Sequence, residues 1–69
     1  MQEQTFYIKE AFSEPYIQRL EQVLNDVIGV ERVLVDTADG EVKIEFNQKE
    51  ISMERIAMTL MEHDFTILH

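Results

Sequence analysis

The apolar residues of this chain switch back and forth between two periods, and this succession restricts its fold more than any other feature. Over residues 5–9 they alternate with polar residues, which predicts a strand with one exposed face. From Tyr16 onward they recur at steps of three and four, which predicts an amphipathic helix. Ser13 is a suitable N-cap for this helix, and Gly29 is a suitable residue to end it. The helix face predicted to be buried carries Ile17, Leu20, Leu24, Val27 and Ile28.

The second half of the chain shows the same two periods. Residues 30–37 and 41–46 alternate on either side of an Asp-Gly turn at residues 38–40, which predicts a β-hairpin. Ser52 is a suitable N-cap for a second helix. Residues 65–68 alternate again and predict a short final strand. The buried side of the second helix is predicted to carry Met53, Ile56, Ala57, Leu60 and Met61.

The predicted order of elements is therefore βαββαβ. Because crossover connections are right-handed, both helices should lie on one face of a four-stranded antiparallel sheet with strand order 4-1-3-2. This arrangement is the ferredoxin-like sandwich of the α+β class. A chain of 69 residues supports one small hydrophobic core, so we expect a single domain over residues 1–69.

Charge and composition exclude several classes of function. Acidic residues number 14 against 6 basic ones, for a net charge of −8. Such a chain is poorly suited to nucleic acid or an anionic membrane, because both are bound through Lys and Arg. No apolar run reaches bilayer length, so we expect a soluble cytoplasmic protein. The chain has no cysteine, which excludes thiolate metal ligands and thiol catalysis.

Residues at the junctions of the pattern are similar to those of a known family. Gly29 and Val30 follow the first helix, Gly40 lies in the hairpin turn, and Phe65 opens the final strand. In these features, and over most of residues 5–67, the chain resembles heavy-metal-associated domains, the copper-chaperone-like modules. The resemblance implies their fold, and partners that dock briefly at the loop after the first strand and at the first helix. The other matching positions are Ile17, Leu20, Glu21, Leu24, Val33, Val35, Val42, Ile44, Ile56, Ala57 and Leu60.

The loop after the first strand departs from that family. Its Cys-x-x-Cys pair falls on Ser13 and Tyr16, its glycine and methionine fall on Glu10 and Ala11, and Asp64 replaces a later glycine. A soft ion such as Cu(I) prefers thiolate ligands. A serine hydroxyl and a phenol are neutral at pH 7 and do not replace a thiolate. The metal ligands of the family therefore cannot be transferred to this chain.

Two functions remain open, and the first is a non-catalytic protein-interaction or regulatory module. Its predicted partner-binding residues are Phe12, Ser13, Pro15 and Tyr16, which follow one another at the former metal loop. Exposed aromatic side chains there would form a docking point, whereas rings packed under the loop against Phe65 would not. We expect a protein partner, no cofactor, and a monomer or weak homodimer.

The second open function is a metal-ion binder or carrier in heavy-metal transport. The first loop should lie beside the entry to the last strand, which would bring carboxylates close to a histidine. Such groups hold Zn²⁺ or another borderline ion. The predicted ligands are Glu10, Glu14, His63 and Asp64. A thioether copper site from Met53, Met58 and Met61 has less support, because core packing accounts for Met53 and Met61.

An enzyme is not expected, since the sequence has neither a glycine-rich phosphate loop nor a nucleophile elbow. The open face of the predicted sheet carries three large apolar side chains, those of Tyr7, Leu34 and Leu68. Self-association through this face or through an edge strand is a further prediction.

Overall fold

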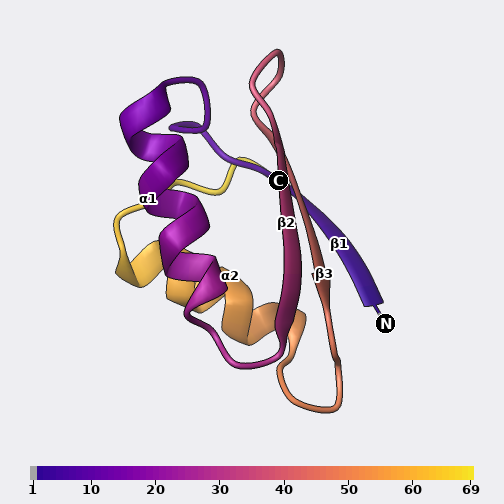
Figure 1. Cartoon of the computed structure of the whole chain (residues 1–69). Helices are drawn as coiled ribbons and strands as arrows, with labels where there is room; N and C mark the ends of the chain where they lie inside the picture. Colours follow the sequence, from indigo (N-terminus) through magenta and orange to yellow (C-terminus); the bar gives the residue numbers. More distant parts are fainter. Residues whose placement is uncertain (1) are drawn as a thin grey trace.

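The computed structural model describes residues 2–69 and forms two layers. Both helices cover the same face of an antiparallel sheet, as Figure 1 shows. The predicted class, an α+β fold with two helices on one face of the sheet, is confirmed. In the described part of the chain, neither helix combines the length and the apolarity that crossing a membrane requires. The elements are β1 (Gln2–Tyr7), α1 (Glu14–Asn25), β2 (Val30–Asp36), β3 (Glu41–Phe46) and α2 (Met53–Glu62).

The sheet formed by residues 2–69 has three strands in the order β1-β3-β2, and both neighbouring pairs are antiparallel. The central strand β3 alternates strictly between buried and half-buried residues, as a period of two requires. Its inward side chains Val42 and Ile44 are fully buried and face Phe6 of β1 and Val33 of β2 in register. Its buried side chains belong to the same hydrophobic core cluster as those of both helices.

The predicted fourth strand, at residues 65–68, is wrong: within residues 2–69 this segment makes a single antiparallel bridge, Ile8 to Ile67. The segment does lie beside the end of β1, where Lys9 N–H donates to the Thr66 carbonyl at 2.9 Å. The Thr66 N–H, however, donates to the Glu10 carboxylate at 2.8 Å. A side chain thus takes a donor that a strand ladder would use, and most of the outer edge of β1 stays uncovered.

The first helix ends earlier than predicted. It stops at Asn25 with Asp26 as its C-cap, and a turn leads from there to β2. Ile28 lies in that turn and is 80% exposed, so its predicted place on the buried face is wrong. The positive φ of Gly29, 101°, reverses the chain, and a Cβ there would lie only 2.8 Å from Ile51 Cγ2.

The second helix buries a narrower stripe than predicted. Ile56 and Leu60 are fully buried, and Ala57 is half-buried against the core. Met53 and Met61 were predicted to be buried, but they are 37% and 54% exposed. Ile56 and Leu60 lie about one helical turn apart, and both belong to the core cluster. The methionines on either side are therefore left at the rim.

Candidate docking site at the start of helix α1

The loop between β1 and α1 is held by two buried side chains. Ile8 and Ala11 are 0% and 1% exposed, and Ala11 N–H donates to the Ile8 carbonyl at 3.1 Å. This tight turn brings Ser13 to the N-cap position with extended backbone angles, as predicted. Pro15 follows in the first turn, where its missing N–H costs no helical hydrogen bond. The Ser13 side chain makes no cap hydrogen bond.

Two aromatic side chains of this loop are exposed. Phe12 is 54% exposed and Tyr16 is 47% exposed. Packing of these rings under the loop against Phe65 is therefore not what the chain does. Phe65 is buried, and the Arg19 guanidinium lies 5.6 Å from the centre of its ring. A cation at this distance from an aromatic face is attracted to it, so Arg19 covers the ring in place of a second aromatic side chain.

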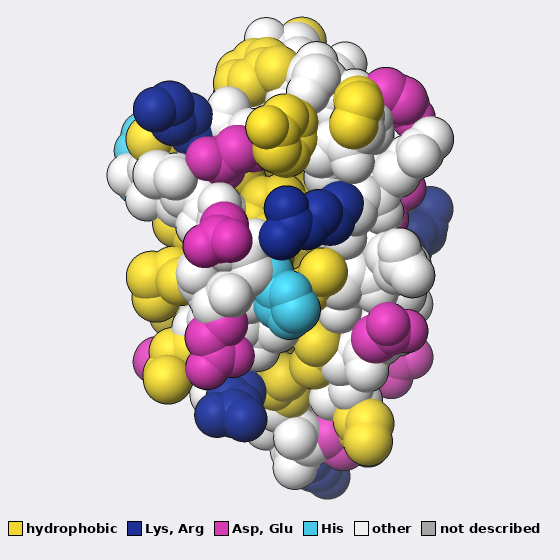
Figure 2. All heavy atoms as spheres, turned by 90° about the vertical axis from the view of Figure 1, so that its left-hand side faces the viewer, with side chains coloured by type: hydrophobic (Ala, Val, Ile, Leu, Met, Phe, Trp, Pro, Cys, Tyr) yellow, Lys and Arg dark blue, Asp and Glu magenta, His cyan; other side chains and the backbone are white. Residues whose placement is uncertain are grey.

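The Phe12 ring rests on the hairpin turn. A Cβ built on Gly40 would lie 2.9 Å from the Phe12 ring edge and 2.9 Å from the Ile8 carbonyl oxygen. Gly40 is buried and has a positive φ of 75°. We call Phe12, Ser13, Pro15 and Tyr16 the aromatic tip. Figure 2 shows the side of the molecule that lies on the left in Figure 1. Hydrophobic side chains gather at its upper end, which is the end at which α1 begins in Figure 1.

Glu10 precedes the aromatic tip in the same loop, and its carboxylate accepts a hydrogen bond from the Thr66 N–H. Partial burial raises the pKa of Glu10, but the hydrogen bond from Thr66 N–H and the charge of Lys9 outweigh it, and the net pKa is lowered. The carboxylate is therefore ionised at neutral pH. Its hydrogen bond ties the first loop to the segment that follows α2.

The four predicted metal ligands are not gathered into one cluster. Glu10 is bound to the Thr66 N–H, and Glu14 accepts a long 3.5 Å hydrogen bond from Gln18. His63 and Asp64 follow one another at the end of α2, both exposed. Over residues 2–69, no three His, Asp or Glu side chains form a group that could hold a metal ion.

Arg19 is a member of this region that sequence reasoning missed. Its Nη2 donates to the His63 carbonyl at 3.0 Å, which links α1 to the exit of α2. The contact joins residues 44 positions apart, so no local sequence pattern predicts it. Arg19 lies three residues after Tyr16 on the predicted polar face, so helical spacing identified only the side of α1 on which it would lie.

Tyr7 and Leu34, opposite Glu41 and Lys43 of β3, lie on the open face of the sheet as predicted, and Leu68 lies outside the three strands. Leu34 and Leu68 are 42% and 58% exposed. Tyr7 is half-buried: its hydroxyl donates to Glu41 at 3.3 Å, and its ring meets the His69 ring edge-on at 4.7 Å. The neighbouring Glu41 carboxylate raises the pKa of Tyr7. Self-association through this face stays a prediction.

Replacing Glu10 with glutamine is expected to cost stability at neutral pH and much less in acid. The folded chain lowers the pKa of Glu10, so the stabilisation is fully present above the unfolded pKa and is lost as pH falls through the folded one. We expect an effect below about 1 kcal/mol, because the carboxylate keeps contact with water. Urea unfolding at pH 7 and pH 3 measures it.

Glu14→Gln is the matched control, because it removes the same charge from an exposed position that accepts a long hydrogen bond from Gln18. Its change in stability measures how much any loss of one negative charge relieves repulsion in this acidic chain, and that amount is subtracted from the effect of Glu10→Gln. A difference between wild type and Glu10→Gln that grows toward low pH would contradict the assigned role of the carboxylate.

The fold is similar to that of solved metallochaperone and metal-binding domains, and the sequence has no cysteine. Solved structures with the same fold include a "CopZ metallochaperone", 12% identical with a TM-score of 0.88, over 97% of this chain and 100% of that one. A copper-binding domain from HMA7, described as a P-type ATPase, is 18% identical with a TM-score of 0.87, over 100% of this chain and 96% of that one.

Oxidised MerP from Ralstonia metallidurans is also similar, with 13% identity and a TM-score of 0.85, over 99% of this chain and 97% of that one. These comparisons confirm the resemblance to heavy-metal-associated domains at the level of the fold. No protein-family model and no curated protein matches the sequence. The chain keeps the scaffold and has no cysteine.

Proposed function

We propose that this domain is a non-catalytic protein-interaction or regulatory module that docks through the aromatic tip without metal. The observation that carries the proposal is the exposure of Phe12 and Tyr16 on a loop anchored by buried Ile8 and Ala11. Aromatic side chains held in place lose little entropy on binding and are enriched where interfaces gain most of their affinity. The tip thus offers a small, prearranged hydrophobic surface.

The charges around the tip favour a basic partner. Glu10 and Glu14 belong to the same segment as the tip, and although Lys9 and Arg19 also lie in this region, the chain as a whole has a net charge of −8. A basic surface approaching this end would be attracted over a distance, which raises the association rate more than the affinity. We propose a cytoplasmic monomer or weak homodimer that meets such a protein partner transiently.

The metal-binding alternative requires Glu10, Glu14, His63 and Asp64 to converge. Glu10 would have to release Thr66, and the Arg19 cation lies at the His63 carbonyl. We therefore rank this function second. Calorimetry with Zn²⁺, Ni²⁺ and Cu²⁺ decides: micromolar binding abolished by Glu14→Ala and by His63→Ala would favour it over the docking module.

The docking proposal predicts where a partner is captured. A photoreactive residue in place of Tyr16 should cross-link a different protein in cells, while the same residue in place of Leu34 should cross-link at most a second copy of this chain. Leu34 is similarly exposed, 42% against 47%, but lies on the sheet face, so it controls for exposure alone. The captured protein is then purified and titrated into the labelled domain with NMR detection.

Shifts should concentrate at residues 10–19, persist with a metal chelator present, and require Phe12. Phe12→Ala should weaken binding about tenfold or more, as expected for an aromatic anchor. Leu34→Ala should leave the affinity unchanged. Shifts confined to other surfaces, or binding that chelator abolishes, would contradict a metal-independent aromatic tip.

A further inference from the structure

The outer edge of β1 presents outward-pointing backbone hydrogen-bonding groups, among which the Thr5 carbonyl accepts a long 3.4 Å hydrogen bond from Gln4 Nε2. Tyr7 uses its outward groups, because its N–H donates to the His69 carbonyl at 2.8 Å and its carbonyl accepts from Leu68 N–H at 2.7 Å. The next residue points the other way, since Ile8 N–H donates to the Gly40 carbonyl. Backbone groups alternate along a strand, so those of Glu3 and Thr5 point outward as those of Tyr7 do. In the sheet of residues 2–69, β1 is an edge strand, and no strand covers its first half.

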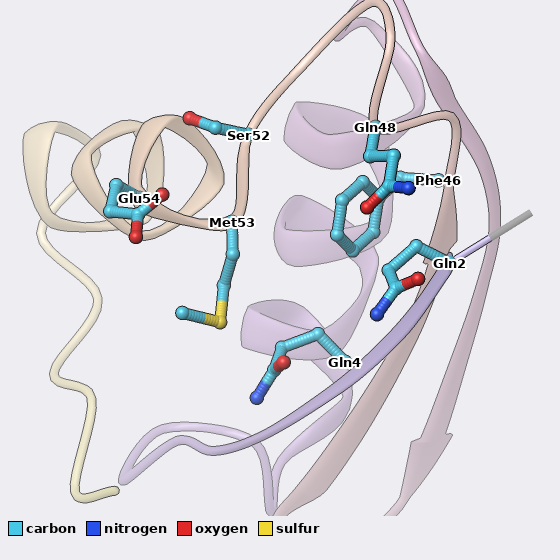
Figure 3. Close-up of a pocket in the computed structure, with 7 residues that line it drawn as sticks. All are labelled: Gln2, Gln4, Phe46, Gln48, Ser52, Met53 and Glu54. Carbon is cyan, nitrogen blue, oxygen red and sulfur yellow. The ribbon is translucent and has the colours of Figure 1, made fainter.

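A hollow of about 360 Å³ lies beside this uncovered half of β1. Gln2 and Gln4 share a strand face with buried Phe6, so the hollow is on the helix side of the sheet. Figure 3 shows the Met53 side chain reaching down from the start of α2 and the Phe46 ring forming the inner wall. The complete lining is Gln2, Gln4, Phe46, Gln48, Ser52, Met53 and Glu54.

Acidic side chains lie on both sides of the uncovered edge. On the open face of the sheet, Glu3 stands directly opposite Glu45, an arrangement of like charges that costs stability unless a cation joins it. On the helix side, Glu54 lines the hollow. Arg32 is the partner of Glu45 on its far side, and Lys43 stands opposite Thr5, so the acidic stretch is confined to the start of β1.

We propose that the outer edge of β1 at Glu3 and Thr5 binds an extended segment of a partner protein as an additional strand. Main-chain hydrogen bonds to Glu3 and Thr5 would supply the affinity, with the long bond from the Gln4 side chain to the Thr5 carbonyl replaced, and alternate side chains would supply the specificity. Those on the open face would be Lys or Arg, beside Glu3 and Glu45. Those on the other face would be apolar and would enter the hollow against Met53 and Phe46.

This site lies at the opposite end of the domain from the aromatic tip, as Figure 1 shows, and it does not depend on the docking proposed there. A second copy of the chain is a poorer occupant. Its β1 would bring another Glu3 to the acidic stretch and a second net charge of −8 to the interface. A basic segment meets neither obstacle.

The test is an NMR titration of the labelled chain with a blocked peptide of alternating sequence, Lys-Val-Lys-Val-Lys. Shifts are expected at residues 2–6 and at Met53, and the amide of Thr5 should exchange with water more slowly. A peptide with the same composition but the sequence Lys-Lys-Lys-Val-Val controls for charge alone. N-methylation of alternate peptide bonds should weaken binding about tenfold, because it removes ladder donors.

On the protein side, Thr5→Pro removes the outward N–H and leaves the bonds to β3 in place, as proline at a strand edge permits. It should weaken the peptide about tenfold, while Thr5→Val should not. Phe12→Ala should have no effect, which separates this site from the aromatic tip. The proposal is overturned if Glu-Val-Glu-Val-Glu or the blocky peptide binds as well. Shifts of β1 that depend on protein concentration alone would instead assign the edge to a second copy.

Discussion

Leu60→Ala is expected to lower the free energy of unfolding by about 2–5 kcal/mol, the largest effect of any single change considered for this chain. Leu60 is fully buried in the core cluster, on the stripe of α2 that faces β3. Removing its side chain loses hydrophobic transfer energy and leaves a cavity that the surrounding side chains fill only in part. A small domain has a total stability of about 5–10 kcal/mol, so this one substitution would remove a large share of that stability.

Urea denaturation followed by circular dichroism measures this loss. The control is Leu68→Ala, the same chemical change at a leucine that is 58% exposed. It should change the stability by no more than about 0.5 kcal/mol. Equal losses in the two variants would show that Leu60 does not occupy the core as described.

Gly40→Ala is expected to cost about 1–3 kcal/mol and to displace the Phe12 ring. The φ of Gly40 is +75°, a region that alanine enters only with strain. Its Cβ would also meet the Ile8 carbonyl oxygen at 2.9 Å, a backbone atom that cannot move aside cheaply. The Phe12 ring, on the other side, is 54% exposed, so the added methyl group can push it toward solvent.

Gly29→Ala is the matched control for Gly40→Ala. Gly29 has a positive φ of 101° too, but its Cβ would meet Ile51 rather than the aromatic tip. Both variants should lose stability in urea, and only Gly40→Ala should shift the Phe12 ring resonances in NMR spectra. If the Phe12 ring resonances do not shift in Gly40→Ala, the hairpin turn does not determine the position of that ring.

Most of the fold follows from local periodicity. The strict alternation of β3 predicted its buried residues, and helical spacing predicted Leu20 and Leu24 in the core. These predictions succeed because one side of a central strand, or one face of a packed helix, lies against the core along its whole length. Ser52, whose hydroxyl accepts from Arg55 N–H, is an equally local signal for the start of α2.

The errors arise where distant residues decide. The final strand failed because the Glu10 carboxylate, 56 positions away, takes the Thr66 N–H. Met53 was misplaced because helical spacing gives the direction of a side chain but not how much of the helix surface the rest of the chain covers. At the candidate site, the loop and its residue types were predictable. The exposure of Phe12 was not, since it depends on the hairpin turn beneath its ring and on Arg19 covering Phe65.

The exposed methionines give this chain a particular response to oxidants. A domain that has no cysteine cannot form a disulfide or a sulfenic acid, so thioethers are its readily oxidised groups. Met53, Met58 and Met61 are 37%, 48% and 54% exposed, and none lies in the core cluster. Conversion to the sulfoxide would therefore leave the fold intact and make the rim of α2 more polar. At Met53 that change would fall on the wall of the hollow beside β1, where a reductase could reverse it.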